Sequence, residues 1–106
     1  MIAGVDVFEV LAEPNRRAIL TLLRERDRAV GDLVETLALA QPTVSKHLKV
    51  LRTNGFVSVR PDAQRRVYHL RHEPLRALDA WLEPYRTTWA DRLDALTAHL
   101  DQMEER

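Results

Sequence analysis

The chain has 106 residues, of which 45% are hydrophobic, and it contains no cysteine. This length suffices for one domain with a modest core, and we expect partner subunits to add stability. The absence of thiols excludes a disulfide framework, a thiolate metal site and a cysteine nucleophile. No apolar run approaches the roughly 18 residues of a membrane span, and the first residues do not resemble a secretory signal, so a cytoplasmic protein without membrane contact is expected.

The formal net charge is zero, but the charges are unevenly distributed along the sequence. Between Gln41 and Arg71 there are seven Lys or Arg residues and one acid, Asp62, so this block carries +6 and the remainder −6. A basic block in an acidic frame lets one face meet a polyanion while the other faces meet solvent or a partner. The distribution therefore favours binding to nucleic acid, whose phosphates attract basic side chains.

The first part of the chain predicts three short helices, each with apolar residues at helical spacing. The first spans Val5–Ala12, and the second begins at Pro14, where the missing N–H costs nothing, and ends at about Arg26. The third spans Val30–Leu37 and is followed by a three-residue turn. The second of these helices is expected to be the scaffold of the fold.

A fourth helix is expected from Pro42 to the pair Asn54-Gly55, because glycine readily adopts the left-handed conformation that ends helices. One face of this helix is apolar, with Val44, Leu48 and Leu51. The outward side chains are small polar or basic: Thr43, Ser45, Lys46, Lys49 and Arg52. Two helices joined by a tight turn form a helix-turn-helix, in which the second helix fits the major groove of DNA.

Two alternating strands follow, and residues 61–64 are expected to form the turn between them. The inward positions are Val57, Val59, Tyr68 and Leu70. The adjacent Arg65 and Arg66 lie near the turn of this hairpin, where they can reach a neighbouring minor groove whose negative potential attracts arginine. Solubilising loop charge is the alternative interpretation of the two arginines, and Tyr68 is expected to pack in the core.

From Pro74 to the end, the apolar residues recur every three or four positions, which predicts one long helix. So small a domain cannot cover the whole stripe, and we expect a second copy of the chain to do so. Pro84 is expected to kink or split this helix. The predicted dimer interface consists of Val5, Phe8, Tyr85, Trp89, Leu93, Leu96 and Leu100. A small-molecule pocket lined by Trp81, Tyr85 and Trp89 stays open as an alternative.

Together these elements predict a mainly α fold: a winged helix-turn-helix with about five helices and a two-stranded β-hairpin wing, dimeric through its terminal helices. Residues 1–106 are expected to form a single DNA-binding domain, with 74–106 as the C-terminal dimerisation helix.

Three segments resemble the arsenic-repressor (ArsR/SmtB-type) family of winged-helix transcriptional regulators: FEVLAEPNRRAILTLL, VGDLVETLALAQPTVSKHLKVLRTNGFV and RRVYHL. The resemblance covers roughly Phe8 to Leu70. It implies a homodimeric repressor that binds double-stranded DNA at a palindromic operator and leaves it when a small-molecule or protein effector binds. The family's recognition positions correspond here to Gln41, Thr43, Ser45, Lys46 and Lys49, and its wing arginines to Arg65 and Arg66.

The chain departs from the family pattern in two places. Ala40 stands where relatives commonly have Ser, which removes a helix cap worth about 1 kcal/mol. Founding members bind metal through cysteines on the third helix or through Asp and His pairs on the C-terminal helix. Here Asp91, Asp94 and His99 lack that pairing, so the resemblance is to the non-metal-sensing branch, with no metal site and no cofactor.

An enzyme is not indicated, because there is no Gly-rich phosphate loop and neither Ser45 nor Ser58 has a base and an orienting group beside it. His47, His69 and His72 are expected to pack or face solvent rather than bind metal. The main alternative function is a winged-helix module for protein–protein contact without DNA binding, since the fold alone does not dictate function. The basic block with small polar residues on its outward face favours DNA.

Overall fold

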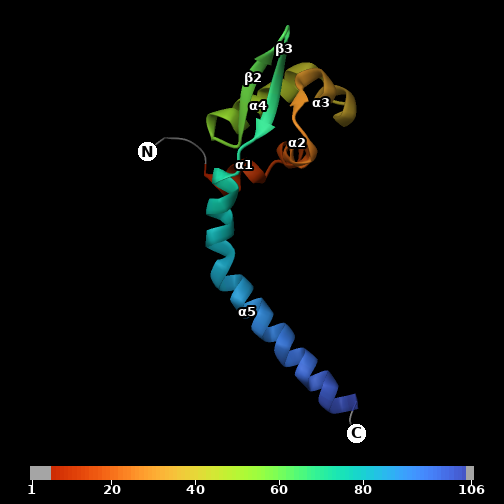
Figure 1. Cartoon of the computed structure of the whole chain (residues 1–106), viewed down its shortest axis with the longest axis vertical. Helices are drawn as coiled ribbons and strands as arrows, with labels where there is room; N and C mark the ends of the chain where they lie inside the picture. The colour runs from red at the N-terminus through yellow and green to blue at the C-terminus, as the bar shows by residue number, and fades with distance from the viewer. Residues whose placement is uncertain (1–5, 105–106) are drawn as a thin grey trace. The chain divides into compact units, whose positions relative to one another are not determined.

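The computed structural model describes residues 6–104, which form two units that divide between Leu75 and Arg76. The last helix, α5 (Glu73–Glu104), begins in the first unit and makes up the second. The other elements belong to the first unit and are α1 (Val7–Leu11), α2 (Pro14–Glu25), β1 (Arg28–Ala29), α3 (Val30–Leu37), α4 (Gln41–Thr53), β2 (Val57–Asp62) and β3 (Arg65–Leu70) (Figure 1). The predicted mainly α winged helix-turn-helix is confirmed.

The core of the first unit is formed by apolar faces of α1 to α4 and by the inner side of the sheet. The two stripes predicted on α2 and α4 are both buried: Ile19, Leu20, Leu23, Val44, Leu48 and Leu51. Tyr68 is also buried, which confirms its predicted packing role. Because α4 is anchored through one face only, its opposite face is left on the surface.

The first helix is shorter than predicted. Asp6 is its N-cap, and the carboxylate Oδ1 accepts a hydrogen bond from the Glu9 N–H at 2.9 Å, so the helix begins at Val7. Ala12 is the C-cap, and Glu13 then caps α2 by accepting from the next two backbone N–H groups. Val5, which was predicted to lie in this helix and in the dimer interface, falls outside the described residues.

The helix-turn-helix follows the prediction closely. The three-residue turn begins with Ala38, which adopts a left-handed conformation at φ 55°. At the other end of α4, Gly55 has φ 79°, and the Phe56 N–H donates to the Leu51 carbonyl at 2.9 Å. This hydrogen bond and the burial of Phe56 close the helix as the Asn54-Gly55 signal indicated.

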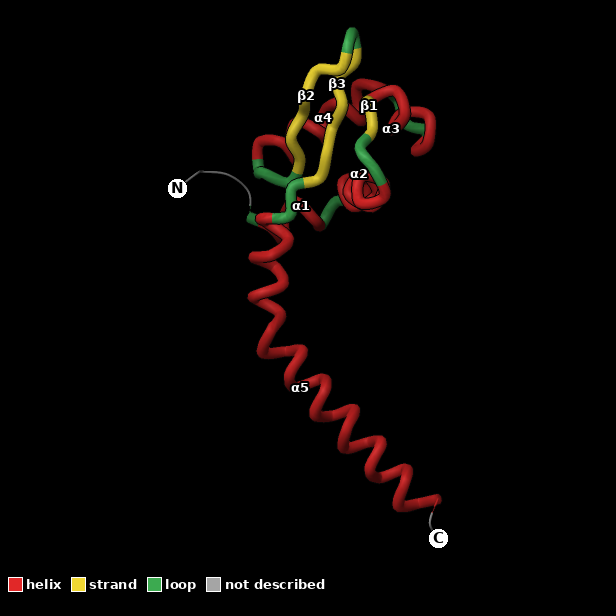
Figure 2. Tube along the Cα trace, in the orientation of Figure 1, coloured by secondary structure: helices red, strands yellow, loops and turns green. Residues whose placement is uncertain are grey.

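The sheet has three strands rather than two, in the order β1-β3-β2, all antiparallel (Figure 2). The third strand, β1, was not predicted, because two residues are too few to show an alternating pattern. The predicted turn at residues 61–64 was too long, since only Ala63 and Gln64 lie between the strands and Ala63 supplies the positive φ of a tight hairpin. Pro61 is tolerated in β2 because β2 is an edge strand.

Arg28 of β1 links the sheet to the helices. It is 7% exposed, and its guanidinium donates to the Leu22 carbonyl at 3.0 Å, to Asp32 at 3.0 Å and to Glu25 at 2.8 Å. These partners lie on α2 and α3, while β1 itself pairs with β3. The position of the hairpin relative to the helix-turn-helix is therefore held by a buried charge with three acceptors.

The prediction for Pro84 was a kink or a split, and α5 runs through this proline as one helix, so the helix is not split. Figure 1 shows its axis changing direction partway along, as a proline inside a helix causes. The apolar side chains of its second half are exposed, from 63% for Leu93 to 49% for Leu100. None of the helices in the described part of the chain is long and apolar enough to cross a membrane.

Candidate nucleic-acid interface

The outer face of α4 gathers most of the predicted contact residues. Val44, Leu48 and Leu51 are buried on the inner face, and the helical period turns the intervening residues outward. The predicted residues that are exposed on this helix are Gln41, Ser45, Lys46, Lys49 and Arg52, and Thr43 is half-buried. The helix therefore presents small polar groups near its start and cations along its length.

The hairpin forms a hollow together with the end of α4. Arg52 comes from the last turn of α4, Val59, Arg60 and Pro61 come from β2, and Arg66 comes from β3. No acid is among these lining residues. Two predicted DNA-binding arginines that are distant in sequence thus lie at one hollow.

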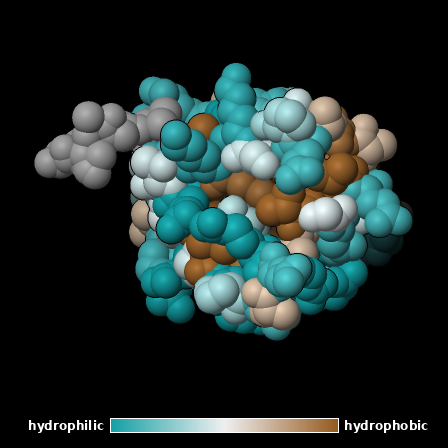
Figure 3. Space-filling model, turned by 90° about the horizontal axis from the view of Figure 1, so that it is seen from above, coloured by the Kyte–Doolittle hydropathy of each residue, from teal (hydrophilic) through white to brown (hydrophobic). Residues whose placement is uncertain are grey.

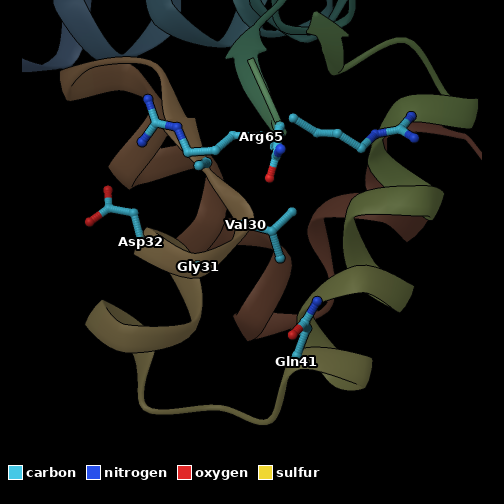
Figure 4. A pocket seen from close by; sticks show the side chains of 8 residues that line it. Val30, Gly31, Asp32, Gln41 and Arg65 are labelled. Atoms are coloured by element: carbon cyan, nitrogen blue, oxygen red, sulfur yellow. The ribbon is translucent and has the colours of Figure 1, made fainter. Parts of the chain in front are cut away.

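A second hollow lies where the hairpin tip meets the starts of α3 and α4. It is lined by Ala29, Val30, Gly31, Asp32, Gln41, Gln64, Arg65 and Arg66 (Figure 4). In this view the Arg65 side chain extends toward the side where Asp32 lies. The fold therefore brings the first residue of α4 and the wing arginines together, as DNA contact from both elements requires.

Arg65 and Arg66 lie on opposite faces of the hairpin, because successive side chains of a strand alternate. Arg65 is paired across the strands with Asp62, and its Nη2 lies 3.2 Å from the Asp62 carboxylate. Arg66 is paired across the strands with Pro61, on the face that carries Val59 and Tyr68. The two neighbouring arginines thus have different surroundings.

The seven basic residues of the predicted block fall into two groups. Three are held by carboxylates: Arg60 by Asp27 at 2.9 Å, Arg65 by Asp62 at 3.2 Å and Arg71 by Glu73 at 3.1 Å. Within residues 6–104, no ion pair or hydrogen bond engages the side chains of the other four, which are Lys46, Lys49, Arg52 and Arg66. The uncompensated positive charge of this block therefore lies on α4 and on the hairpin face that carries Arg66.

Of the three histidines predicted to pack or to face solvent, two take structural positions and His72 is exposed. His47 turns inward from α4, with its side chain 12% exposed and its Nε2 3.6 Å from the Glu13 carboxylate at the start of α2. His69 hydrogen-bonds with the Ser58 hydroxyl across the hairpin. Among the described residues there is no group of three or more His, Asp or Glu side chains that could hold a metal ion.

The hairpin-tip end of the molecule has a mainly hydrophilic surface. Figure 3, which is seen from that end, shows hydrophobic residues gathered in the middle and hydrophilic residues around them.

Several contacts at this surface could not be read from local patterns. Arg60 and Asp27 are 33 residues apart, and Gln64 and Gly31 meet at one hollow only through the fold. The short β1 that brings these segments together carries no periodic signal of its own. The helix that carries the predicted contact residues is visible in the sequence, but the network that holds the hairpin beside it is not.

Comparison with known proteins identifies the family. Residues 13–59 match the family described as bacterial regulatory protein, arsR family. The HTH-type transcriptional regulator Rv2034 of Mycobacterium tuberculosis is 42% identical over 80 residues, which are 76% of this chain and 75% of the relative. The chain belongs to the ArsR family.

Other ArsR-family similarities agree. The arsenical resistance operon repressor of Staphylococcus xylosus is 34% identical over 77% of this chain and 79% of its own length. The solved structure of the ArsR-like transcriptional regulator from Rhodococcus sp. RHA1 superposes with a TM-score of 0.67 at 28% identity, covering 85% of each chain. This ArsR-family protein is therefore a DNA-binding transcriptional regulator, and the names of its relatives agree with the expectation that it is not an enzyme.

Proposed function

We propose that this ArsR-family protein is a homodimeric repressor that reads a palindromic operator through α4 and is released by an inducer. The observation that carries the proposal is the unpaired positive charge on the outer face of α4, beside small polar side chains. Relatives named as repressors, such as the transcriptional repressor SdpR of Bacillus subtilis, support the sense of regulation.

The proposed contacts divide into reading and positioning. Gln41, Thr43 and Ser45 lie in the first turns of α4 and carry short or amide side chains suited to base edges in a major groove. Positive charge further along the surface holds the phosphate backbone and sets the register. The positioning residues are Lys46, Lys49 and Arg52 of α4 and Arg65 and Arg66 of the wing.

The proposed dimer uses α1 and α5. Two recognition helices enter successive major grooves about 34 Å apart only if a rigid interface sets their separation. Exposed apolar side chains on these helices support their use as that interface: Phe8, Tyr85, Trp89, Leu93, Leu96 and Leu100. Contiguous apolar surface of this kind is costly in water, and a second copy of the same helix would cover it.

We further infer that the protein acts in the cytoplasm, where a bacterial regulator meets its operator. The inducer is proposed to be something other than a metal ion, since the chain has no cysteine and lacks the Asp and His pairs of the metal-binding relatives.

A gel-shift titration tests this function. The full chain is mixed with a duplex from its own promoter and, separately, with a random duplex of equal length, and the promoter complex is then footprinted. We expect tighter binding to the promoter, with two protected half-sites one helical turn apart. Equal affinity for both duplexes would contradict sequence-specific reading. Increased transcription from that promoter in a reporter strain carrying the protein would contradict repression.

A further inference from the structure

The hollow between α4 and the hairpin contains two arginines that have no partner and one that has. Arg52 and Arg66 line it from α4 and β3, and among the described residues neither is engaged by a carboxylate. Arg60 also lines it, but strand alternation places the Arg60 side chain on the opposite face of β2 from Val59 and Pro61. Its Nη1 lies 2.9 Å from the Asp27 carboxylate. Two free guanidinium groups therefore belong to this hollow.

The remaining lining residues carry no negative charge that would repel an anion. Val59 and Pro61 supply an apolar floor, and no acid lines the hollow. Charge-assisted hydrogen bonds to phosphate strengthen where water is reduced, and guanidinium is the side-chain group that matches phosphate oxygens in pairs. An unpaired arginine also gives up no existing ion pair when it binds.

We infer that this hollow binds one backbone phosphate of duplex DNA through Arg52 and Arg66 together. The inference rests on the proposed function and adds a defined site to it. It places the phosphate between the C-terminal end of the recognition helix and the wing, so one phosphate fixes the register of both elements. Arg60, the third arginine of the hollow, stays with Asp27 and takes no part in the contact.

Fluorescence anisotropy with the full chain and a labelled random-sequence duplex tests the inference across a salt series. Arg52→Gln and Arg66→Gln should each weaken binding roughly tenfold, as expected for a lost charge-assisted contact. Each should also lower the slope of log affinity against log salt concentration by about one unit per bound protomer. The double variant should lower the slope by no more than either single change, because the contact needs both guanidinium groups and is already lost when one of them is removed.

The matched control removes the neighbouring ion pair. Arg60→Gln combined with Asp27→Asn changes an arginine of the same hollow but leaves the net charge unaltered, and its salt slope should equal that of the wild type. All four substituted side chains are exposed, so each variant is expected to fold, and circular dichroism checks that it does.

Three outcomes overturn the inference. The first is a slope for the Arg60 and Asp27 control that falls as far as that of Arg66→Gln. The second is a double variant whose slope falls by the sum of the two single changes, which would mean two separate phosphates. The third is an unchanged slope for Arg52→Gln or Arg66→Gln while the wild type binds normally. A wild-type chain that binds no duplex would instead defeat the proposed function itself.

Discussion

At the scale of single residues, we propose that α4 carries two kinds of DNA contact, one to base edges and one to phosphates. Ser45 is exposed near the start of α4, and Thr43 is half-buried beside it, while Lys49 lies a turn further along with no partner among the described residues. A short hydroxyl at close approach senses a base edge, whereas a lysine on a flexible stem neutralises any phosphate. Loss of the two kinds of residue should therefore have different consequences.

The first prediction compares Ser45→Ala with Lys49→Ala. Ser45→Ala, and likewise Thr43→Ala, should reduce the preference for the operator over random DNA, at a cost of about 1–3 kcal/mol for operator binding alone. Lys49→Ala should weaken binding to both DNAs and lower the salt slope by about one unit per protomer. Anisotropy titrations on the two duplexes measure both effects. An equal loss on both duplexes for Ser45→Ala would show that it does not read bases.

At the scale of elements, α4 begins without a side-chain cap. Ala40 occupies the N-cap position in an extended conformation, φ −67° and ψ 145°, but a methyl group cannot accept a hydrogen bond from the first N–H groups of the helix. The start of the contact helix is therefore held by packing and by Pro42 in its first turn rather than by a cap.

The second prediction is that Ala40→Ser stabilises the protein. The serine hydroxyl would accept from the Thr43 N–H, which now donates only to the Ala40 carbonyl at 3.1 Å. A side-chain cap there should raise the free energy of unfolding by about 1 kcal/mol. For a chain of this size that corresponds to an increase in Tm of about 4–8 °C in calorimetry. Ala90→Ser, an exposed position inside α5, serves as the control and should give no gain. A Tm for Ala40→Ser at or below that of the wild type would be evidence that the N–H groups are already satisfied.

At the scale of the whole molecule, the exposed apolar stripe of α5 supports the proposal that a second copy of the chain covers it. Helix periodicity places Leu93 and Leu96 on one continuous face, and both side chains are exposed, Leu93 by 63% and Leu96 by 53%. A proposed two-fold interface there would make DNA binding depend on residues that never touch DNA.

The third prediction is that Leu93→Asp, or Leu96→Asp, abolishes operator binding. A carboxylate in an apolar interface would cost several kcal/mol, which a small domain can hardly absorb. Light scattering should then report a monomer or an aggregate. Ala98→Asp adds the same charge on the opposite side of α5 and should leave the dimer and its DNA binding intact. A Leu93→Asp protein that stays dimeric with unchanged operator affinity would place the interface elsewhere.

The fourth prediction is that metal ions do not regulate the binding of the protein to its operator. Zinc, cadmium or arsenite at about micromolar concentration should not change operator affinity, because the chain has no thiolate and no complete set of histidine and carboxylate ligands. Gel-shift titrations with and without each ion measure this. A tenfold loss of affinity on adding an ion, about 1.4 kcal/mol of coupling, would reveal a metal site formed between subunits or elsewhere.

Local signals in the sequence were sufficient for the helices and for the face of α4. The apolar period of 3.6 residues, the proline that opens α2 and the glycine at position 55 act within a few residues of where they occur, so their consequences can be read directly. For the same reason, the exposed positions of α4 were predicted from the buried ones. The family resemblance rested on these same segments, and it was confirmed.

Only the tertiary structure decided how the hairpin is held and which charges stay free. The strand β1, the buried Arg28 and the Asp27–Arg60 pair join segments that are far apart in sequence, and contacts of that kind leave no periodic trace. Seven basic residues look alike in the sequence, but the fold neutralises three with nearby carboxylates and leaves four unpaired within the described residues. Composition sets how much positive charge the chain carries, whereas pairing through space decides where that charge is available to a phosphate.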